Sequence, residues 1–179
     1  MRSSNNLSEA WLTIDHINHM NHFHCIDRDG DNHVQIFLQE QALDLMERNL
    51  VRTRLFFDES QNLIGFYSLF NDTIKIHKNK REEINIHLPH GVKEIPAVRL
   101  HYIGVDDRYK EQGYGDILMS SVLVNCIKIA QISGCPLITV ESTESVREFY
   151  YRYDFSYVRP ERNYRLMVMN TKKLLHLVN

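Results

Sequence analysis

The stretch Lys110-Glu111-Gln112-Gly113-Tyr114-Gly115 decides how this chain of 179 residues is expected to fold. It follows an extended, mostly apolar run over residues 97–105, and it opens a helical pattern that ends near Gly134, where a C-terminal cap would stand. The apolar residues of that pattern share one helical stripe: Tyr114, Ile117, Leu118, Val122, Cys126 and Ile129. The sequence therefore predicts a strand, a tight turn and a helix, in this order.

The two glycines of this stretch allow two interpretations. Gly113 and Gly115 remove side chains either because the backbone turns tightly or because it approaches a bound phosphate. A helix N-terminus offers free amides and a partial positive charge, which is worth about 0.3–1 kcal/mol per favourable anion contact. Lys110 would add a cation at the mouth of such a site. On its own, the stretch fits a tight turn or a diphosphate cradle.

Hydrophobic periodicity and turn residues place the other elements on either side of this stretch. The predicted elements are a strand at 11–14, a helix at 34–49, a hairpin of strands 52–57 and 63–70, an extended piece at 73–77, a surface insertion at 78–94, a strand at 136–140, a short helix through 151 and a last strand at 165–169.

Composition limits the class of protein. With 179 residues and 43% hydrophobic content, one globular domain over 1–179 is expected, with residues 1–8 disordered. Three cysteines at irregular spacing indicate neither a disulfide framework nor zinc knuckles, so we expect a cytoplasmic protein. We expect no apolar segment to reach the length of a membrane span, and no membrane partner is expected.

Charge is spread unevenly along the chain. The formal net charge of −2 argues against a protein whose whole surface binds nucleic acid. The segment 147–173, however, carries seven cations and three anions, a net charge of +4. Such a segment is either an ordinary solvated face or a rim that contacts phosphates.

Two motifs resemble the GNAT acetyltransferase superfamily. Its first signature is Gln or Arg, two residues, Gly, one residue, then Gly or Ala, shortly after a strand; Gly113 and Gly115 match, and Lys110 takes the Gln/Arg position. Downstream, the stretch from Val146 to Phe155 (VREFYYRYDF) resembles the family's Ala-x-x-Phe-Tyr-x-x-x-Gly-Phe segment, with Asp154 where Gly is usual. If the turn there requires the left-handed (αL) conformation, aspartate adopts it more readily than most other residues.

The upstream half resembles one branch of that superfamily more faintly. Phe23-x-Cys25, a helix containing Phe37-Leu38 and the stretch 63–69 (LIGFYSL) are similar to the branch that includes the tRNA-acetylating toxins of toxin–antitoxin modules. The resemblance covers most of residues 23–170 and is strongest from 97 to 157. Compared with that branch, Ile26 replaces a usual Gly, and the stretch 27–34 is expanded.

The resemblance implies a fold and a cofactor site. The fold is a mixed α/β (α+β) domain whose central, mostly antiparallel sheet is splayed near Val105 and flanked by helices. The bound molecule is acetyl-CoA. The residues implied to hold it are Ile103, Gly104, Val105, Lys110, Glu111, Gln112, Gly113, Tyr114, Gly115, Asp116 and Thr143.

The resemblance also implies catalytic roles. Tyr150 stands at the position of the family's general acid, which protonates the departing thiolate; its other interpretation is an ordinary core tyrosine. Some family members carry a base glutamate on the strand before Val105, but Arg99 occupies that position. His101, two residues on, is the remaining base candidate, unless it is a structural histidine.

The function implied is the transfer of an acetyl group from acetyl-CoA to a primary amine by direct attack. The acceptor is a small molecule or peptide in the main interpretation and the α-amine of aminoacyl-tRNA in the alternative; a non-catalytic acyl-CoA-binding regulator is a third. Without a strong base, α-amines are the easier acceptors, since their pKa lies nearer to 7 than that of lysine. The toxin branch leaves open a homodimer and an antitoxin partner.

Two apparent metal motifs do not hold up. His16, His19, His22, His24 and Cys25 lack a second ligand pair at fixed spacing, so no zinc site is predicted. Asp27-Arg28-Asp29-Gly30-Asp31 is similar to a calcium loop, but aligning Gly30 with the loop glycine places Cys25 and Ile36 at the end positions. That register destroys the ligand set.

Overall fold

The computed structural model describes residues 7–175, which fall into two compact units. Within these residues, unit 1 comprises 7–70 and 101–121, and unit 2 comprises 71–100 and 122–175. The polar start of the chain, residues 1–6, lies outside the described residues, whereas Ser8 already begins a strand. The single domain predicted over 1–179 stays a prediction.

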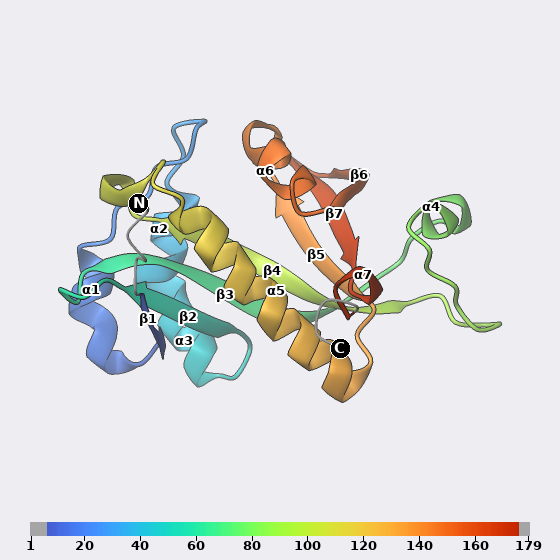
Figure 1. The fold of residues 1–179 in the computed structure, drawn as a ribbon, viewed down its shortest axis with the longest axis horizontal. Helices are drawn as coiled ribbons and strands as arrows, with labels where there is room; N and C mark the ends of the chain where they lie inside the picture. The colour runs from blue at the N-terminus through green and yellow to red at the C-terminus, as the bar shows by residue number, and fades with distance from the viewer. Residues whose placement is uncertain (1–6, 176–179) are drawn as a thin grey trace, which may run out of the picture. The chain divides into compact units, whose positions relative to one another are not determined.

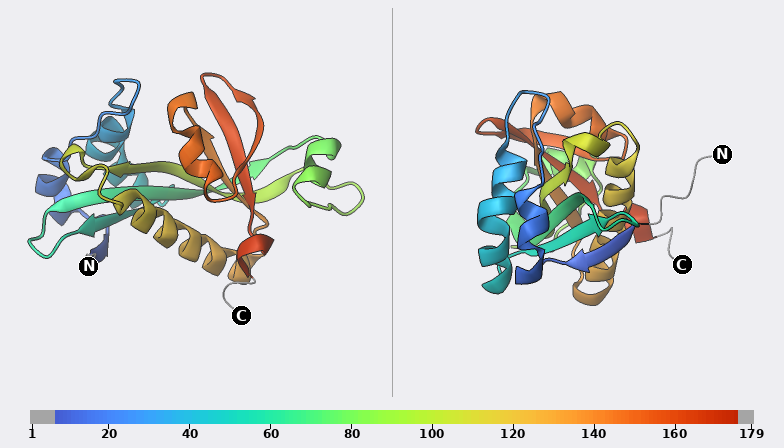
Figure 2. Two further views of the ribbon diagram at one scale, coloured as in Figure 1. Left: turned by 45° about the horizontal axis from the view of Figure 1, so that its top comes forward. Right: turned by 90° about the vertical axis from the view of Figure 1, so that its left-hand side faces the viewer.

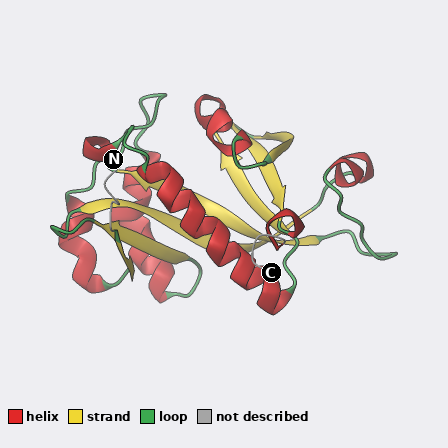
Figure 3. Cartoon of the chain, in the orientation of Figure 1, coloured by secondary structure: helices red, strands yellow, loops and turns green. Residues whose placement is uncertain are grey.

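Seven strands form the sheet in the order β1-β2-β3-β4-β5-β7-β6 (Figure 1). Their bounds are β1 Ser8–Trp11, β2 Arg52–Phe57, β3 Leu63–Ile74, β4 Ile95–Val105, β5 Leu137–Ser142, β6 Ser156–Glu161 and β7 Tyr164–Asn170. The β1–β2, β2–β3, β5–β7 and β6–β7 pairs are antiparallel, and β4–β5 is parallel. The helices are α1 Ile17–Asn21, α2 His33–Ile36, α3 Ala42–Glu47, α4 Lys78–Glu83, α5 Tyr114–Ser133, α6 Arg147–Tyr151 and α7 Lys172–Leu175 (Figure 3).

Unit 1 is built on the β2–β3 hairpin. A π-helical turn, Phe37–Gln41, joins α2 to α3, and together with α1 they cover one face of the hairpin. The core on that face includes Phe23, Phe37, Leu38, Leu55 and Phe66, all fully buried. On the other face the first turns of α5 approach: the hydroxyls of Tyr67 and Ser121 lie 3.2 Å apart.

Unit 2 is built on β5 and β7, with β6 at its outer edge (Figure 2). The β4–β5 ladder runs only from Ala97 and Leu137 to Leu100 and Val140. β4 itself continues to Val105, within unit 1. The parallel ladder therefore ends well before the strand does.

The insertion predicted at 78–94 is anchored from within. After α4, Ile84 and Ile86 are buried against Ile74, Ile76 and Ile95. The Asn170 side-chain amide also donates hydrogen bonds to the Ile84 and Asn85 carbonyls, at 3.0 and 3.2 Å. The exposed turns of the segment thus rest on a buried isoleucine cluster.

Helix α5 differs from the expectation that no apolar segment reaches the length of a membrane span. By length and composition alone it is long and apolar enough to cross a membrane, although the core helix of a water-soluble protein passes the same test. Leu118, Met119, Val122 and Cys126 are buried, and 28% of the apolar window is buried in all. Ile117, which the sequence placed on the same stripe, is instead partly exposed.

The predicted mixed α/β fold with a mostly antiparallel sheet and flanking helices is confirmed. The helix expected at 34–49 is the run His33–Glu47, and the hairpin at 52–70 is correct. The extended piece at 73–77 begins as the end of β3, and Gly134, at φ +67°, ends α5 as predicted. The first strand was wrong by three residues, and β6 was missed.

Candidate active site

The predicted site residues divide between the two units. In unit 1 are His101, the strand end Ile103-Gly104-Val105, and the stretch from Lys110 to Asp116. In unit 2 are Thr143 and Tyr150.

The end of β4 packs too closely for side chains at its glycine. A Cβ on Gly104 would lie 2.5 Å from Val34 Cγ1, and one on Gly65 would lie 2.5 Å from the Gly104 carbonyl oxygen. Such distances are not tolerated without movement. A side chain at Gly65 would therefore collide with the backbone of β4, whereas one at Gly104 would require Val34 to move.

Asp106 anchors the turn that follows β4. Its side chain is fully buried and accepts hydrogen bonds from the Arg108 guanidinium at 2.7 Å and from the His24 and Arg108 amides at 3.0 Å. Burial alone would raise the pKa of Asp106, but these hydrogen bonds outweigh it and lower the pKa below its ordinary value. The ionised carboxylate therefore fixes the position of the turn.

The turn then exposes free backbone donors at the start of α5. Glu111 and Gly113 have φ values of +60° and +85°, so the chain takes two left-handed steps before the helix. Among the described residues, the amides of Gly113, Tyr114 and Gly115 donate no hydrogen bond. A Cβ on Gly113 would meet nothing within 4 Å, so the space beside these amides is open. The geometry suits a bound anion.

Lys110 is engaged within its own unit. Its ammonium pairs with the Asp107 carboxylate and donates to the Ile26 carbonyl, while the Ile26 amide donates to Asp107 at 3.2 Å. Lys110 thus ties the backbone at Ile26 to the cradle. Its predicted contact with phosphate stays a prediction.

The other predicted cradle residues form the turn and the start of the helix. The Gln112 side chain donates a hydrogen bond to the Arg108 carbonyl at 3.2 Å, and Asp116 lies in the first turn of α5.

His101 sits in an aromatic cluster. Its ring centroid lies 5.0 Å from that of Phe37, 5.1 Å from that of Phe70 and 4.5 Å from that of Tyr102, all edge-on. The imidazole is half-buried. This packing is enough to explain a histidine at this position, and its role as a base stays a prediction.

Tyr150 is the buried residue of α6. It is 6% exposed and packs edge-on against Phe149 and Phe155, with ring centroids 5.3 and 5.7 Å away. Within residues 7–175 its hydroxyl makes no hydrogen bond, and burial raises its pKa above the ordinary value. The group is therefore a protonated hydroxyl with a vacant hydrogen-bonding position.

The turn behind Tyr150 supports the match to the second motif. Asp154 takes φ +63°, as its place at the usual Gly position requires, and the Phe155 amide returns to the Tyr150 carbonyl at 3.3 Å. Thr143 lies just before the 3₁₀ turn that leads into α6, with its hydroxyl 3.0 Å from that of Ser145. Its contact with a cofactor stays a prediction.

Arginine and aromatic side chains alternate on the surface of α6 and the turn after it. Arg147 lies over the Tyr151 ring at 5.5 Å, and Arg152 lies over Phe149 and Tyr153 at 5.3 and 5.8 Å. Glu144 neutralises Arg147 and Arg165 in part. Within the described chain, Arg162, Lys172 and Lys173 have no carboxylate partner, so the +4 segment keeps unbalanced cations.

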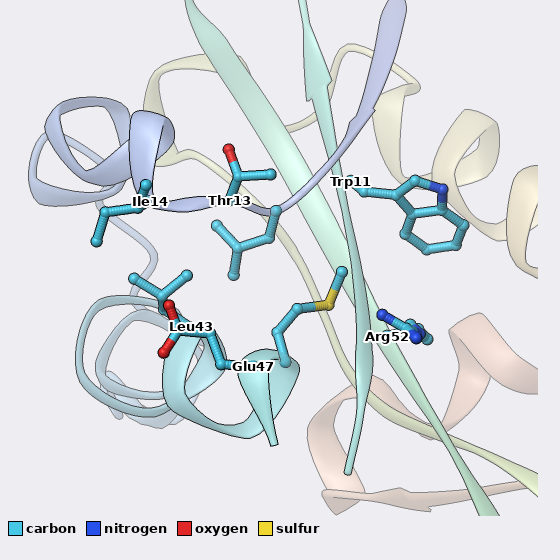
Figure 4. A pocket seen from close by; sticks show the side chains of 8 residues that line it. Trp11, Thr13, Ile14, Leu43, Glu47 and Arg52 are labelled. Atoms are coloured by element: carbon cyan, nitrogen blue, oxygen red, sulfur yellow. The ribbon is translucent and has the colours of Figure 1, made fainter. Parts of the chain in front are cut away.

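A groove of about 620 Å³ lies elsewhere in unit 1 (Figure 4). Its walls are Trp11, Leu12, Thr13, Ile14, Leu43, Met46, Glu47 and Arg52. None of the predicted site residues lines it.

The sequence matches no protein-family model and no curated protein. Solved structures do match. A crystal structure of a bacterial toxin superposes with a TM-score of 0.79 at 15% identity, over 97% of this chain and 96% of that one. AtaT complexed with acetyl-methionyl-tRNAfMet gives 0.78 at 19% identity, over 97% and 100%. A tyrosine-to-phenylalanine mutant of KacT gives 0.77 at 19% identity, over 96% and 98%.

The chain has the fold of these toxins. The resemblance drawn from the sequence is thereby confirmed at the level of the fold. The residues that sequence reasoning missed are those that brace the cradle, namely Asp106, Asp107 and Arg108. Asp106 at the end of an apolar strand was a visible signal, but its partner His24 is 82 residues away in sequence.

Proposed function

We propose that this chain is an acetyl-CoA-dependent N-acetyltransferase that acts on the α-amine of aminoacyl-tRNA. One observation carries the proposal: the fold matches, over nearly the whole of both chains, that of AtaT complexed with acetyl-methionyl-tRNAfMet. A related structure is described as AtaTR bound with acetyl-CoA. The site chemistry described above supports both substrates.

The cradle fits the diphosphate of acetyl-CoA. The amides of Gly113, Tyr114 and Gly115 are free donors at the positive end of a 20-residue helix, and the side chain of any residue but glycine at 113 would intrude on the open space beside them. Acetyl-CoA would supply the activated acetyl thioester. The residues of the cradle would hold its diphosphate through backbone amides rather than through Lys110.

Tyr150 would act as the general acid. The neutral amine would attack the thioester carbonyl, and as the N–C bond forms and the C–S bond breaks, the phenol of Tyr150 would give its proton to the departing thiolate. The proton that the amine nitrogen loses on becoming an amide would pass to solvent, and the phenolate would regain a proton from solvent. Because burial raises the pKa of Tyr150, its hydroxyl stays protonated throughout the physiological range. The absence of a hydrogen-bond partner among the described residues leaves that proton available to the thiolate.

The free-energy cost of deprotonating the acceptor amine favours α-amines over lysine side chains. Neutralising a lysine amine with a pKa near 10.4 costs about 4.6 kcal/mol at pH 7, whereas an α-amine near 7.7–8.0 costs about 1–1.4 kcal/mol. Arg99 stands where some members of the resembling family carry a base, and His101 is held in an aromatic cluster. Without a strong base at these positions, the protein would act best on α-amines.

The RNA part of the acceptor would bind the basic surface of unit 2. Arg162, Lys172 and Lys173 keep charge for phosphates, and Tyr151 offers a partly exposed ring beside Arg147. AtaT is also described bound to the C-terminus of the antitoxin AtaR, and KacTA in complex with DNA. We propose by analogy that an antitoxin restrains this chain in the cytoplasm. A homodimer stays a prediction.

An acetyl-transfer assay tests the proposal. Purified protein is incubated with radiolabelled acetyl-CoA and, separately, charged tRNA, free amino acids and lysine peptides. Label is expected on charged tRNA, and Tyr150→Phe is expected to reduce kcat by about 10²–10⁴-fold at unchanged acetyl-CoA affinity. Tyr157→Phe, on β6 of the same unit, is the matched control.

The other outcomes decide between the alternatives. Label confined to amino acids or peptides would identify the small-molecule or peptide acetyltransferase. Tight acetyl-CoA binding with no labelled acceptor would favour the non-catalytic regulator. Expression in cells adds a second test: growth arrest that Tyr150→Phe relieves is expected, and normal growth with active protein would contradict the toxin-like role.

A further inference from the structure

Three charged side chains from three neighbouring strands form an ion cluster in unit 2. Arg99 of β4 donates to Asp72 of β3 from Nε at 2.8 Å, and its Nη2 lies 2.7 Å from the same carboxylate oxygen. Its Nη1 donates to Glu141 Oε1 of β5. Thr139, which pairs with Arg99 in register, lies fully buried beneath, with its hydroxyl 3.5 Å from Asp72.

The cluster lies where the apolar cover of this sheet face ends. Side chains alternate along a strand, so Ala97 and Arg99 share a face of β4, as Leu137, Thr139 and Glu141 share a face of β5. Ala97 and Leu137 belong to the buried isoleucine cluster under the insertion. One pleat further, the side chains of Asp72, Arg99 and Glu141 are 15%, 21% and 31% exposed, so Glu141 is the outermost member.

Within the described residues, Glu141 is the member of the cluster with an unused hydrogen-bond acceptor. Arg99 satisfies its fork with the two carboxylates, and Asp72 uses one oxygen for Arg99 and the other for the Thr73 amide at 2.8 Å. Glu141 uses Oε1 for Arg99, while its Oε2 has no partner in the described part of the chain. One guanidinium also leaves two carboxylates with a net charge of −1. A cation can therefore complete the cluster at Glu141 Oε2.

We propose that Glu141 binds the ammonium group of the acceptor, and that Arg99 and Asp72 position it. The carboxylate missing from β4 at Arg99 is thus present on β5, held by that arginine. Naming the ammonium as the acceptor rests on the proposed function. The acceptor class this selects is a primary amine that is cationic when it binds, with its nitrogen oriented by a charge-assisted hydrogen bond.

A binding measurement without acetyl-CoA tests Glu141 apart from the reaction. The probes are methionyl-tRNA with a stable amide linkage, whose α-amine is charged, and the same molecule after chemical N-acetylation, which is neutral there. The wild type is expected to bind the charged form about tenfold more tightly. Glu141→Gln is expected to abolish that preference, and Glu148→Gln, which removes the same charge from an exposed position on α6, is expected to keep it.

Two further variants separate misfolding from loss of the site. Glu141→Asp keeps the charge but withdraws the carboxylate by one methylene, and it is expected to lower the preference at an unchanged melting temperature. Arg99→Lys, which loses the planar fork, is expected to lower the preference while retaining part of it. A wild type without preference, or a Glu141→Gln variant that keeps it, would overturn the proposal.

Turnover measured on the same proteins keeps the two proposals apart. If the wild type acetylates charged tRNA and Glu141→Gln matches it in kcat/KM and in charge preference, the role of Glu141 is wrong and the reaction stands. If no amine is acetylated but the preference still depends on Glu141, the reaction is wrong and the ammonium site stands.

Discussion

Asp106 shows how one buried charge supports a whole loop. It is fully buried, and it accepts hydrogen bonds from Arg108, just before the cradle, and from His24, on a distant segment of the chain. Replacing the carboxylate with an amide keeps the shape but removes the charge that these donors need. The stability of unit 1 should therefore depend on the ionisation of this side chain.

Asp106→Asn is expected to lower the free energy of unfolding at pH 7 by about 2 kcal/mol, the usual worth of hydrogen bonds to a charged group. Because the folded pKa is lowered, the contribution is complete above the ordinary carboxyl pKa and is lost as pH falls through the folded value. Urea unfolding at pH 7, 5 and 3.5 measures the difference. Asp15→Asn, at an exposed position of the same unit, is the control; a wild-type advantage that stays constant down to pH 3.5 would contradict the role of ionisation.

Among the elements, the N-terminus of α5 carries the proposed diphosphate site. Gly113→Glu and Gly113→Gln bring the same strain at φ +85° and nearly the same volume, so they differ in charge alone. A carboxylate beside a diphosphate costs about 1 kcal/mol per pair at 4 Å even in water, so Gly113→Glu should bind acetyl-CoA at least about tenfold more weakly than Gly113→Gln. Calorimetry measures both affinities. Equal affinities would mean that the diphosphate binds elsewhere.

How much of each element could be predicted depends on how local its cause is. The helix from His33 and the β2–β3 hairpin follow from periodicity and turn residues within their own segments. The edge strand β6 was missed because five of its six residues are half-buried and the other, Pro160, is exposed, so no alternation of buried and exposed residues marks it. β1 was displaced because its position is set by pairing with β2, some 45 residues later in the sequence.

The candidate site divides in the same way. Gly113, Gly115 and Tyr150 could be located from motif spacing, and the left-handed Asp154 follows from its place in the second motif. The contacts of Lys110 and Glu141 could not be predicted, because their partners, Ile26 and Arg99, are brought to them by the fold and not by proximity in the sequence. The motif locates the residue in the sequence, and its tertiary contacts determine what the side chain can bind.

For the whole molecule, the proposed chemistry predicts a one-sided pH profile. The acceptor α-amine must be neutral to attack, so kcat/KM should rise about tenfold per pH unit below its pKa of about 7.7–8.0 and then level off. Since burial raises the pKa of Tyr150 above its ordinary value, no fall is expected up to pH 9. Rates with the amide-linked methionyl-tRNA from pH 6 to 9 measure this. A decline between pH 8 and 9 would mean that the acid is a group other than Tyr150.

The insertion after β3 has a consequence for engineering. Because Ile84 and Ile86 lie against Ile74, Ile76 and Ile95, deleting the segment 78–94 would not trim a neutral loop. It would uncover a contiguous apolar patch and strand the Asn170 amide without its two carbonyl acceptors. A chain shortened in this way would expose that apolar patch and aggregate. A minimal version of this protein must therefore keep the segment, or its deletion must be accompanied by polar substitutions at Ile74, Ile76 and Ile95.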